Sequence, residues 1–308
     1  MLPPDTPAGN LRPFAQRVEH LGFEELWIAE DCFLKGGIAQ ACAVLSATSH
    51  LQVGLGIIPA GARNAAYAAM EIATLASLFP GRVAVGIGHG MIAWMRQVGA
   101  WPASPITLLG EYLGAVRTLL RGDTVAAHGR YVWLDGVRLD EPPAVIPDVL
   151  AGVRGPRSLA LARGAADGTI LAEPVTPEYL RLARATGSGP SRHRMVVYNV
   201  AVVDDDRGAA VETARLALER FGEPDWAAHL APLDFGPELA ALRRNCRSGR
   251  EFAMRLPASW VEQLALAGTP DKVSARIGEL AEAGADDVVL IPAGPDPVRA
   301  LDSLARVL

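Results

Sequence analysis

The chain of 308 residues has only two lysines, Lys35 and Lys272, and a formal net charge of −5 at pH 7. Without a basic cluster it has no electrostatic footprint for nucleic acid or for an anionic membrane surface. It also lacks a leader-like start and any apolar run near the roughly 18 residues of a membrane span. We therefore expect a soluble, cytoplasmic protein whose partner is a small molecule.

Cysteine is scarce as well, with Cys32, Cys42 and Cys246 as the three examples. An odd number without metal-ligand spacing predicts a reducing compartment, no disulfide framework and no metal site. The P-loop, the His-Glu-x-x-His helix and the Gly-x-Ser-x-Gly elbow are also missing. Readings as a nucleotide hydrolase, a zinc peptidase or a serine hydrolase therefore have no support.

The sequence does contain a repeat in which apolar strands alternate with amphipathic helices. Strands are expected at 25–29, 51–58, 82–87, 149–151, 168–172, 195–202 and 287–291. Helices are expected at 11–21, 38–50, 64–78, 105–120, 156–163, 177–185, 208–221 and 269–284. This alternation predicts an α/β protein, a (β/α)₈ TIM barrel, with an open doubly wound sheet as the second choice.

Half of the residues are hydrophobic, which is enough for one large core, so residues 1–308 are expected to form a single barrel domain. Two segments interrupt the rhythm. Residues 122–141 read as a β-excursion with turns at Gly129 and Gly136, and residues 222–256 read as an insertion or lid. Only Leu2 and its neighbours remain for the first barrel strand, which is therefore expected to be truncated.

The chemistry of a barrel enzyme gathers on the loops that follow its strands. The adjacent carboxylates Glu30 and Asp31 follow one strand and could supply a general acid, because two such groups in a low-dielectric mouth raise one pKa. A solvated loop pair is the alternative. His89, between Gly88 and Gly90, follows another strand and is expected to donate a hydrogen bond or exchange a proton.

Arg154, Gly155 and Ser158 lie where a strand passes into a helix, and such a junction can bind an anion through backbone N–H groups and a guanidinium. An ordinary turn with an exposed arginine is the alternative, and a phosphate site near Gly294 competes with it. Trp94 and the other tryptophans could stack on a planar ligand or pack in the core.

Several segments of the chain resemble the bacterial-luciferase-like flavin and coenzyme F420-dependent oxidoreductases. They are Leu21-Gly22-Phe23-Glu24-Glu25-Leu26-Trp27, Thr48 to Gly56, Ala73 to Arg82 with its Phe-Pro-Gly-Arg end, Gly86-Ile87-Gly88-His89-Gly90, Asp167-Gly168, and Ala267 to Val273. The resemblance covers nearly the whole chain in the order of the family. The Gly-His-Gly form of the loop is most similar to the F420-using branch.

This resemblance implies a homodimer and a non-prolyl cis peptide between Gly56 and Ile57 that supports the deazaflavin ring. With the strand-end residues, it gives an expected cofactor-binding set of Gly56, Ile57, Gly88, His89, Gly90, Trp94, Gly152, Val153, Arg154, Gly155 and Ser158. Relatives often carry Asp-His after the second strand, whereas this chain has Glu30-Asp31-Cys32. The expected proton donor is therefore Glu30, Asp31 or His89.

The resulting hypothesis is an oxidoreductase that uses coenzyme F420 to transfer a hydride between the deazaflavin and a small organic substrate. One alternative keeps the fold but uses FMN and molecular oxygen as a monooxygenase. Another is a barrel without cofactor that serves in binding or dimerisation. The substrate and the direction of the reaction are not encoded in any motif, because variable loops form the substrate pocket.

Overall fold

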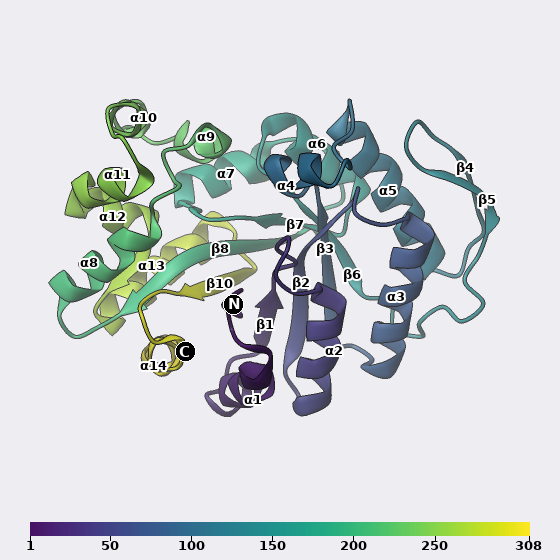
Figure 1. The fold of residues 1–308 in the computed structure, drawn as a ribbon, viewed down its shortest axis with the longest axis horizontal. Helices are drawn as coiled ribbons and strands as arrows, with labels where there is room; N and C mark the ends of the chain where they lie inside the picture. Colours follow the sequence, from purple (N-terminus) through teal and green to yellow (C-terminus); the bar gives the residue numbers. More distant parts are fainter.

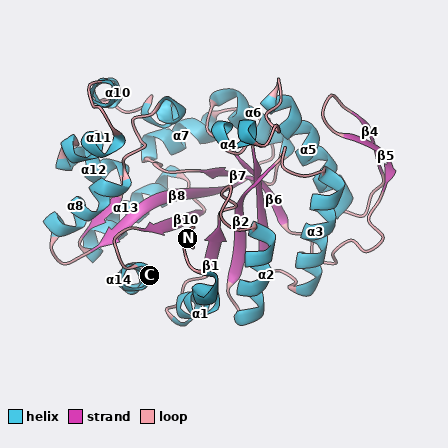
Figure 2. Ribbon diagram, viewed as in Figure 1, coloured by secondary structure: helices cyan, strands magenta, loops and turns pink.

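The structure, a computed structural model that describes residues 1–308, is built around one curved sheet of parallel strands (Figures 1 and 2). The strands lie in the order β1-β2-β3-β6-β7-β8-β10. A doubly wound sheet would reverse its order part-way, so the expected barrel is confirmed and the open sheet is wrong. The strands are β1 (Glu25–Ile28), β2 (Gln52–Pro59), β3 (Val83–Gly88), β6 (Asp148–Gly152), β7 (Gly168–Leu171), β8 (Arg194–Val203) and β10 (Asp287–Pro292), and the short β9 (Leu266–Gly268) pairs with the end of β8.

The barrel has a gap between β10 and β1, where the first strand would lie. Residues 1 and 2 occupy this gap. The backbone N–H of Leu2 donates to the carbonyl oxygen of Trp27 at 2.8 Å, and the backbone nitrogen of Met1 donates to the carbonyl oxygen of Leu290 at 2.7 Å. Figure 1 shows this end of the chain beside β1 and β10. The first strand is therefore reduced to a two-residue bridge, as the sequence predicts.

Helices cover the outside of the barrel, and local sequence sets their ends. Asn64 Oδ1 accepts a hydrogen bond from the N–H of Ala66 at 2.8 Å and caps α3, while Gly284, with φ of 106°, ends α13. The helices are α1 (Leu11–His20), α2 (Gly37–Ala47), α3 (Ala65–Leu78), α4 (Ile92–Gln97), α5 (Pro105–Leu120), α6 (Pro156–Ala165), α7 (Pro177–Ala185), α8 (Arg207–Ala217), α13 (Pro270–Ala283) and α14 (Pro297–Leu304), with 3₁₀ turns at Ala8–Asn10 and Ala305–Val307. None of the helices combines the length and apolarity needed to cross a bilayer.

The segment 122–141 contains an antiparallel pair, β4 (Val125–His128) and β5 (Trp133–Val137). The pair projects from the edge of the barrel beyond α5 (Figure 1). Glu111 of α5 anchors its turn, because the carboxylate accepts three backbone N–H groups of residues 130–132 at 2.8 to 2.9 Å. The predicted β-excursion is thus a hairpin whose turn is anchored by Glu111 and whose Val125, Val132 and Leu134 pack in the main core.

The segment 222–256 is helical and packs in an apolar cluster, separate from the main core, that it shares with α8 and the end of β8 and that includes Phe221, Trp226 and Phe252. The predicted helix 208–221 was wrong beyond Ala217, where α8 ends. The strand β9 and the helix α14 were not predicted. The helical pieces are the 3₁₀ turn Pro224–Trp226, α9 (Ala227–Leu230), α10 (Gly236–Arg244) and α11 (Gly249–Arg255), followed by α12 (Ala258–Leu264).

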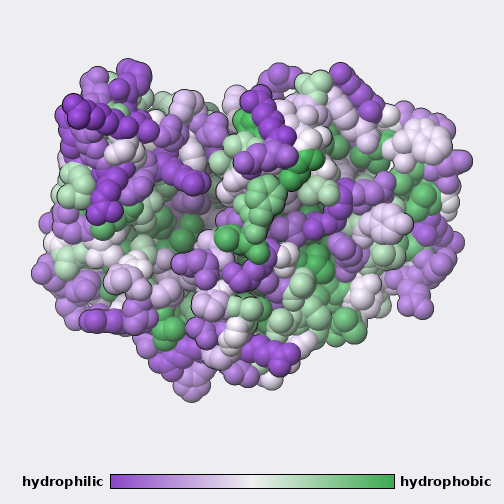
Figure 3. Space-filling view, viewed as in Figure 1, coloured by the Kyte–Doolittle hydropathy of each residue, from purple (hydrophilic) through white to green (hydrophobic).

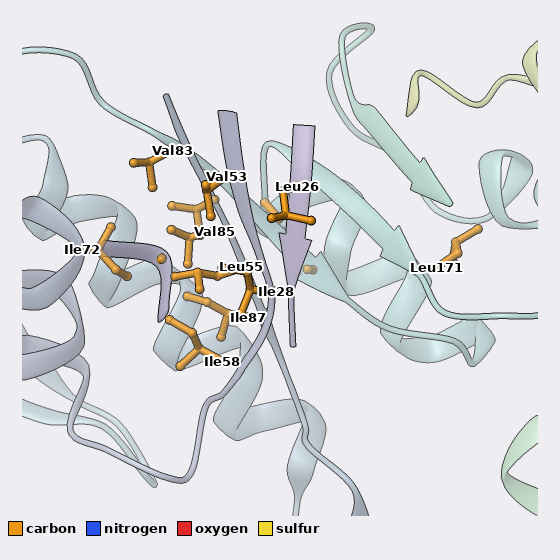
Figure 4. Packing of buried hydrophobic residues seen from close by; sticks show 14 of the residues in the cluster. Leu26, Ile28, Val53, Leu55, Ile58, Ile72, Val83, Val85, Ile87 and Leu171 are labelled. Atoms are coloured by element: carbon orange, nitrogen blue, oxygen red, sulfur yellow. The ribbon is translucent and has the colours of Figure 1, made fainter. Parts of the chain in front are cut away.

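Two apolar layers stabilise the barrel. Outward-facing strand residues pack against the helices, as Figure 4 shows for Val53, Leu55 and Val85 beside Ile72 of α3. Inward-facing residues such as Trp27 and Tyr198 fill the lower half of the barrel. Burial of one such large side chain contributes about 1.5 to 3 kcal/mol. These inward-facing residues leave room for a ligand only at the carboxyl ends of the strands.

Candidate active site

A cavity of about 430 Å³ opens at the carboxyl ends of the barrel strands. This volume lies within the usual range for small-molecule sites. All of the expected site residues line it except Gly88 and Gly155. Those that do are Glu30, Asp31, Gly56, Ile57, His89, Gly90, Trp94, Gly152, Val153, Arg154 and Ser158. The competing phosphate position near Gly294 lies outside the cavity lining.

The floor of the cavity is the end of β2. The Gly56–Ile57 bond is cis, as the family resemblance predicts, and cis bonds also occur at Cys32–Phe33 and Glu173–Pro174. Several glycines make room for Ile57 rather than for a ligand. A Cβ at Gly152 would lie 2.4 Å from Ile57 Cγ2, and one at Gly88 would lie 2.7 Å from the carbonyl oxygen of Gly152.

Tyr198 of β8 lies next to Gly56 in this floor. Its hydroxyl oxygen lies 1.9 Å from the position of a Cβ at Gly56, so only glycine fits there. The side chain is 4% exposed, lines the cavity, and its hydroxyl has no hydrogen-bond partner. Buried hydroxyls are normally hydrogen-bonded, so this unpaired group is available to a ligand.

The two adjacent carboxylates differ in their surroundings. Glu30 is paired with Arg63, with Oε1–Nη1 at 2.9 Å and Oε2–Nη2 at 3.0 Å, and it also accepts the N–H of Gly37 at 2.9 Å. Both oxygens of this carboxylate are thus engaged, by a guanidinium and by a backbone amide. This geometry fits Glu30 to an anchoring role better than to the expected role of an acid.

Asp31 has neither a hydrogen bond nor an ion pair on its side chain, and burial raises its pKa while the nearby Arg220 opposes this effect. Burial lowers the pKa of His89, and the charge of Arg154 lowers it further. His89 is therefore a neutral imidazole near pH 7, able to donate or accept one hydrogen bond. A neutral imidazole is a weak source of protons at this pH.

Arg154 stands between the cavity and the insertion. Its guanidinium lies 5.2 Å from the centre of the Trp226 ring, and Nη1 donates to the carbonyl oxygen of Asp225 at 3.3 Å. Ser158 lies in the first turn of α6, where backbone N–H groups are unsatisfied within the helix. A Cβ at Gly155 would meet nothing within 4 Å, so this junction is open to an anion.

Some lining residues were not among the expected ones. They come from the middle of β8 and from the segment that follows α8, and they include Tyr198, Arg220 and Phe221. The strand-end residue Glu173 and two of the tryptophans, Trp101 and Trp226, line the cavity as well. Alternation along β8 offered one signal, because Arg194, Val196 and Tyr198 share a face. Glu173 lies two residues after the end of β7, and Asp31 lies three residues after the end of β1. No sequence signal places the insertion residues over the mouth.

A sequence profile of the luciferase-like monooxygenase family matches residues 2–287. The chain belongs to this family. The match spans the barrel, the floor of the cavity and the insertion, so the resemblance read from short motifs is confirmed. Members of the luciferase-like family are oxidoreductases that use a flavin or F420, which also confirms the expected enzyme class.

Two relatives of this luciferase-like chain are 5,10-methylenetetrahydromethanopterin reductases of archaea. The protein of Methanolobus tindarius is 24% identical, with 98% of this chain and 96% of the relative covered. That of Archaeoglobus fulgidus is 26% identical over the same shares. Neither identity is high enough to transfer a substrate to this chain.

Three solved structures share the fold. The coenzyme F420-dependent tetrahydromethanopterin reductase of Methanopyrus kandleri has a TM-score of 0.83 and 22% identity, covering 99% of this chain and 96% of its own. An F420-dependent secondary alcohol dehydrogenase with an F420-acetone adduct has a TM-score of 0.75 and 22% identity, covering 96% of this chain and 93% of its own. The 3,6-diketocamphane monooxygenase component of Pseudomonas putida with FMN has a TM-score of 0.71 and 16% identity, covering 100% of this chain and 96% of its own.

Proposed function

We propose that this luciferase-like chain binds coenzyme F420 in the cavity and transfers a hydride between the deazaflavin and a small organic substrate. The observation that carries the proposal is the convergence of the Gly56–Ile57 floor, the Gly-His-Gly loop and the start of α6 on one cavity. The similarity to archaeal reductases along 98% of the chain supports the choice of F420 over FMN.

The cavity fits a flat ring that carries an anionic tail. Ile57 offers an apolar platform, and the unpaired hydroxyl of Tyr198 lies beneath it as a hydrogen-bond donor. Arg154 and Ser158 would hold the phosphate, since a guanidinium and the first turn of a helix both favour negative charge. His89 would contact the ring from the side opposite the floor.

When bound, the cofactor supplies the hydride chemistry, and the protein contributes binding, orientation and exclusion of water. Phe221 and Trp226 wall the cavity on the side of the insertion, which supports a role of residues 222–256 as a cover over the substrate. A covered site strengthens the electrostatic contacts within it, because the effective dielectric constant falls.

Parallel titrations with F420 and with FMN test this proposal. Quenching of F420 fluorescence that saturates, together with no change for FMN, is the expected result. Saturable binding of FMN alone would replace the proposal with the monooxygenase hypothesis. Binding of neither would leave the barrel without a redox role. Gly36→Ala is a suitable control protein, because a Cβ at this exposed position meets nothing within 4 Å.

We also propose that the chain forms a homodimer through α2 and α3. Figure 3 shows hydrophobic side chains gathered over these two helices. Tyr67, Met70 and Leu78 of α3 are 65%, 49% and 61% exposed. An apolar surface of this kind on a soluble enzyme is typical of a subunit interface.

A further inference from the structure

Glu173 is a strand-end carboxyl group of the cavity to which the family resemblance assigns no role. It lies two residues after the end of β7 and lines the same cavity as the floor residues Gly56 and Ile57. Its side chain accepts no hydrogen bond from another residue and forms no ion pair. The carboxyl group therefore has the capacity to bind a ligand.

The insertion holds the backbone around Glu173 rigidly. Trp226 Nε1 donates to the carbonyl oxygen of Glu173 at 2.9 Å, and His229 Nδ1 donates to the carbonyl oxygen of Pro174 at 3.1 Å. His229 is fully buried and packs against Tyr179 with ring centres 4.4 Å apart and the ring planes tilted by 34°. Two hydrogen bonds from one segment thus fix the position from which Glu173 enters the cavity.

The groups that face Glu173 come from every side of the cavity. Burial raises the pKa of Glu173 and the charge of Asp31 raises it further, while Arg154 and Arg220 act in the opposite direction. Burial raises the pKa of Tyr198 well above its usual value, and the charges of Glu173 and Glu25 raise it further. Burial thus raises the pKa of both carboxyl groups in this mouth, which favours the protonated form of each.

The other acidic and basic groups of the cavity are poorer proton donors. Glu30 is held in the ion pair with Arg63, and burial lowers the pKa of His89, so that its imidazole is neutral at pH 7. Burial raises the pKa of Asp31 and Arg220 opposes this effect, but no hydrogen bond from the insertion fixes the backbone at Asp31. Glu173 is the remaining carboxyl group that combines a rigid backbone, an unpaired side chain and contact with the cavity.

We propose that Glu173 is the catalytic acid of this site, acting on a small compound that contains a C=O or C=N bond. This inference rests on the proposed hydride transfer. A bound reduced cofactor would supply the hydride to the carbon of that bond, and Glu173 would give its carboxyl proton to the oxygen or nitrogen. The product is an alcohol or an amine. The carboxylate regains a proton from water, which balances the proton that the cofactor releases on oxidation.

The first test needs no cofactor. Infrared difference spectra of the wild-type protein and Glu173→Gln should show a protonated carboxyl band at pH 7 that the variant lacks. Asp31→Asn should shift the titration of this band to lower pH, because one negative neighbour is removed. Glu178→Gln, at an exposed position in the first turn of α7, should leave the band unchanged. A wild-type protein without the band, or a band that persists in Glu173→Gln, would overturn the assignment.

The second test uses reduced F420 with a panel of small ketones, aldehydes and cyclic imines, beginning with acetone. Glu173→Gln should lower kcat by about 10²- to 10⁴-fold, the usual contribution of a general acid. Its dissociation constant for F420 should change less than about threefold, since a positioned acid adds little to ground-state binding. The wild-type rate should fall at alkaline pH, and the rate of Glu173→Gln should lose this dependence.

The outcomes separate the two proposals. If F420 does not bind while the carboxyl band behaves as expected, the proposed function fails and the protonated Glu173 stands. If F420 binds and Glu173→Gln keeps the wild-type kcat, the catalytic acid is refuted and the F420 site stands. If no member of the panel is reduced by a protein that binds F420, the assigned class of substrate is wrong.

Discussion

The contact between Gly56 and Tyr198 yields the sharpest prediction about the floor of the cavity. A Cβ in Gly56→Ala would lie 1.9 Å from the hydroxyl oxygen of Tyr198, whereas ordinary contacts begin at 3.4 Å. Since Tyr198 is buried between the strands and touches Trp27, it cannot simply swing into solvent. We expect Gly56→Ala to lower the free energy of unfolding by about 1 to 3 kcal/mol, the cost of overpacking a core.

A double-mutant cycle shows whether the hydroxyl is the cause. Tyr198→Phe removes the clashing oxygen, and because that hydroxyl has no partner, its loss alone should change stability by less than about 1 kcal/mol. The remaining contacts of the new Cβ are at 3.1 Å, which small shifts can relieve. The free energy of unfolding of Gly56→Ala/Tyr198→Phe, measured with urea, should then be higher by about 1 kcal/mol or more than the sum of the two single effects predicts.

The control for this cycle is Gly36→Ala, which adds a Cβ where nothing lies within 4 Å. Its stability should remain within about 0.5 kcal/mol of the wild type, as is usual for surface changes. Strictly additive effects of Gly56→Ala and Tyr198→Phe would refute the reasoning, since they would show that the two groups do not compete for the same space.

Three further changes probe other parts of the molecule. Arg154→Met should weaken F420 binding about 10- to 100-fold, the effect of losing one charged contact, whereas Arg157→Met, exposed on α6, should not, as fluorescence titration would show. Burial lowers the pKa of His229 from 6.5 to about 3, so the folded state resists protonation and stability falls as pH drops below 6.5. Between pH 7 and pH 5 the free energy of unfolding, measured with urea, should fall by about 2 kcal/mol less in His229→Gln than in the wild type. An equal fall in both proteins would contradict this prediction. Leu78→Arg should yield monomers in sedimentation experiments, whereas Leu182→Arg, at another exposed leucine on α7, should leave dimers.

The barrel was predictable because its signals are local. Apolar runs bounded by glycine or proline mark the strands, and Asn64 and Gly284 mark helix ends that the structure reproduces. The strand β9 escaped prediction because three residues, Leu266–Gly268, carry no periodicity and depend on pairing with the end of β8. The bounds of the helices in residues 222–256 escaped for a related reason, since their apolar faces are short and pack on one another and on α8, α12 and the ends of β8 and β9.

The candidate site divides in the same way. Asp31, His89 and Arg154 lie within three residues of the ends of strands. Because the loops after the strands of a barrel meet at one face, their positions alone predict that they line one cavity. Tyr198 lies in mid-strand, where both faces of β8 are apolar and sequence alone does not say which one points inward. The ion pair of Glu30 and Arg63 joins residues 33 positions apart, and no local sequence pattern predicts it.

The strand-end glycines were placed correctly from the sequence, but the reason expected for them was incomplete. They were expected to let a backbone approach a ligand, and at Gly155 the space is indeed open. At Gly88 and Gly152 the absent side chains instead make room for neighbouring backbone and for Ile57. The platform that a ring would rest on thus depends on packing between strands, which appears only once β2, β3 and β6 are side by side.

A crystal structure of the chain with F420 would test the central claim most directly. The deazaflavin ring is predicted to lie against Ile57 within reach of the Tyr198 hydroxyl, with the phosphate at the start of α6 beside Arg154 and Ser158. A ring bound outside this cavity, or a phosphate held near Gly294 instead, would contradict the account.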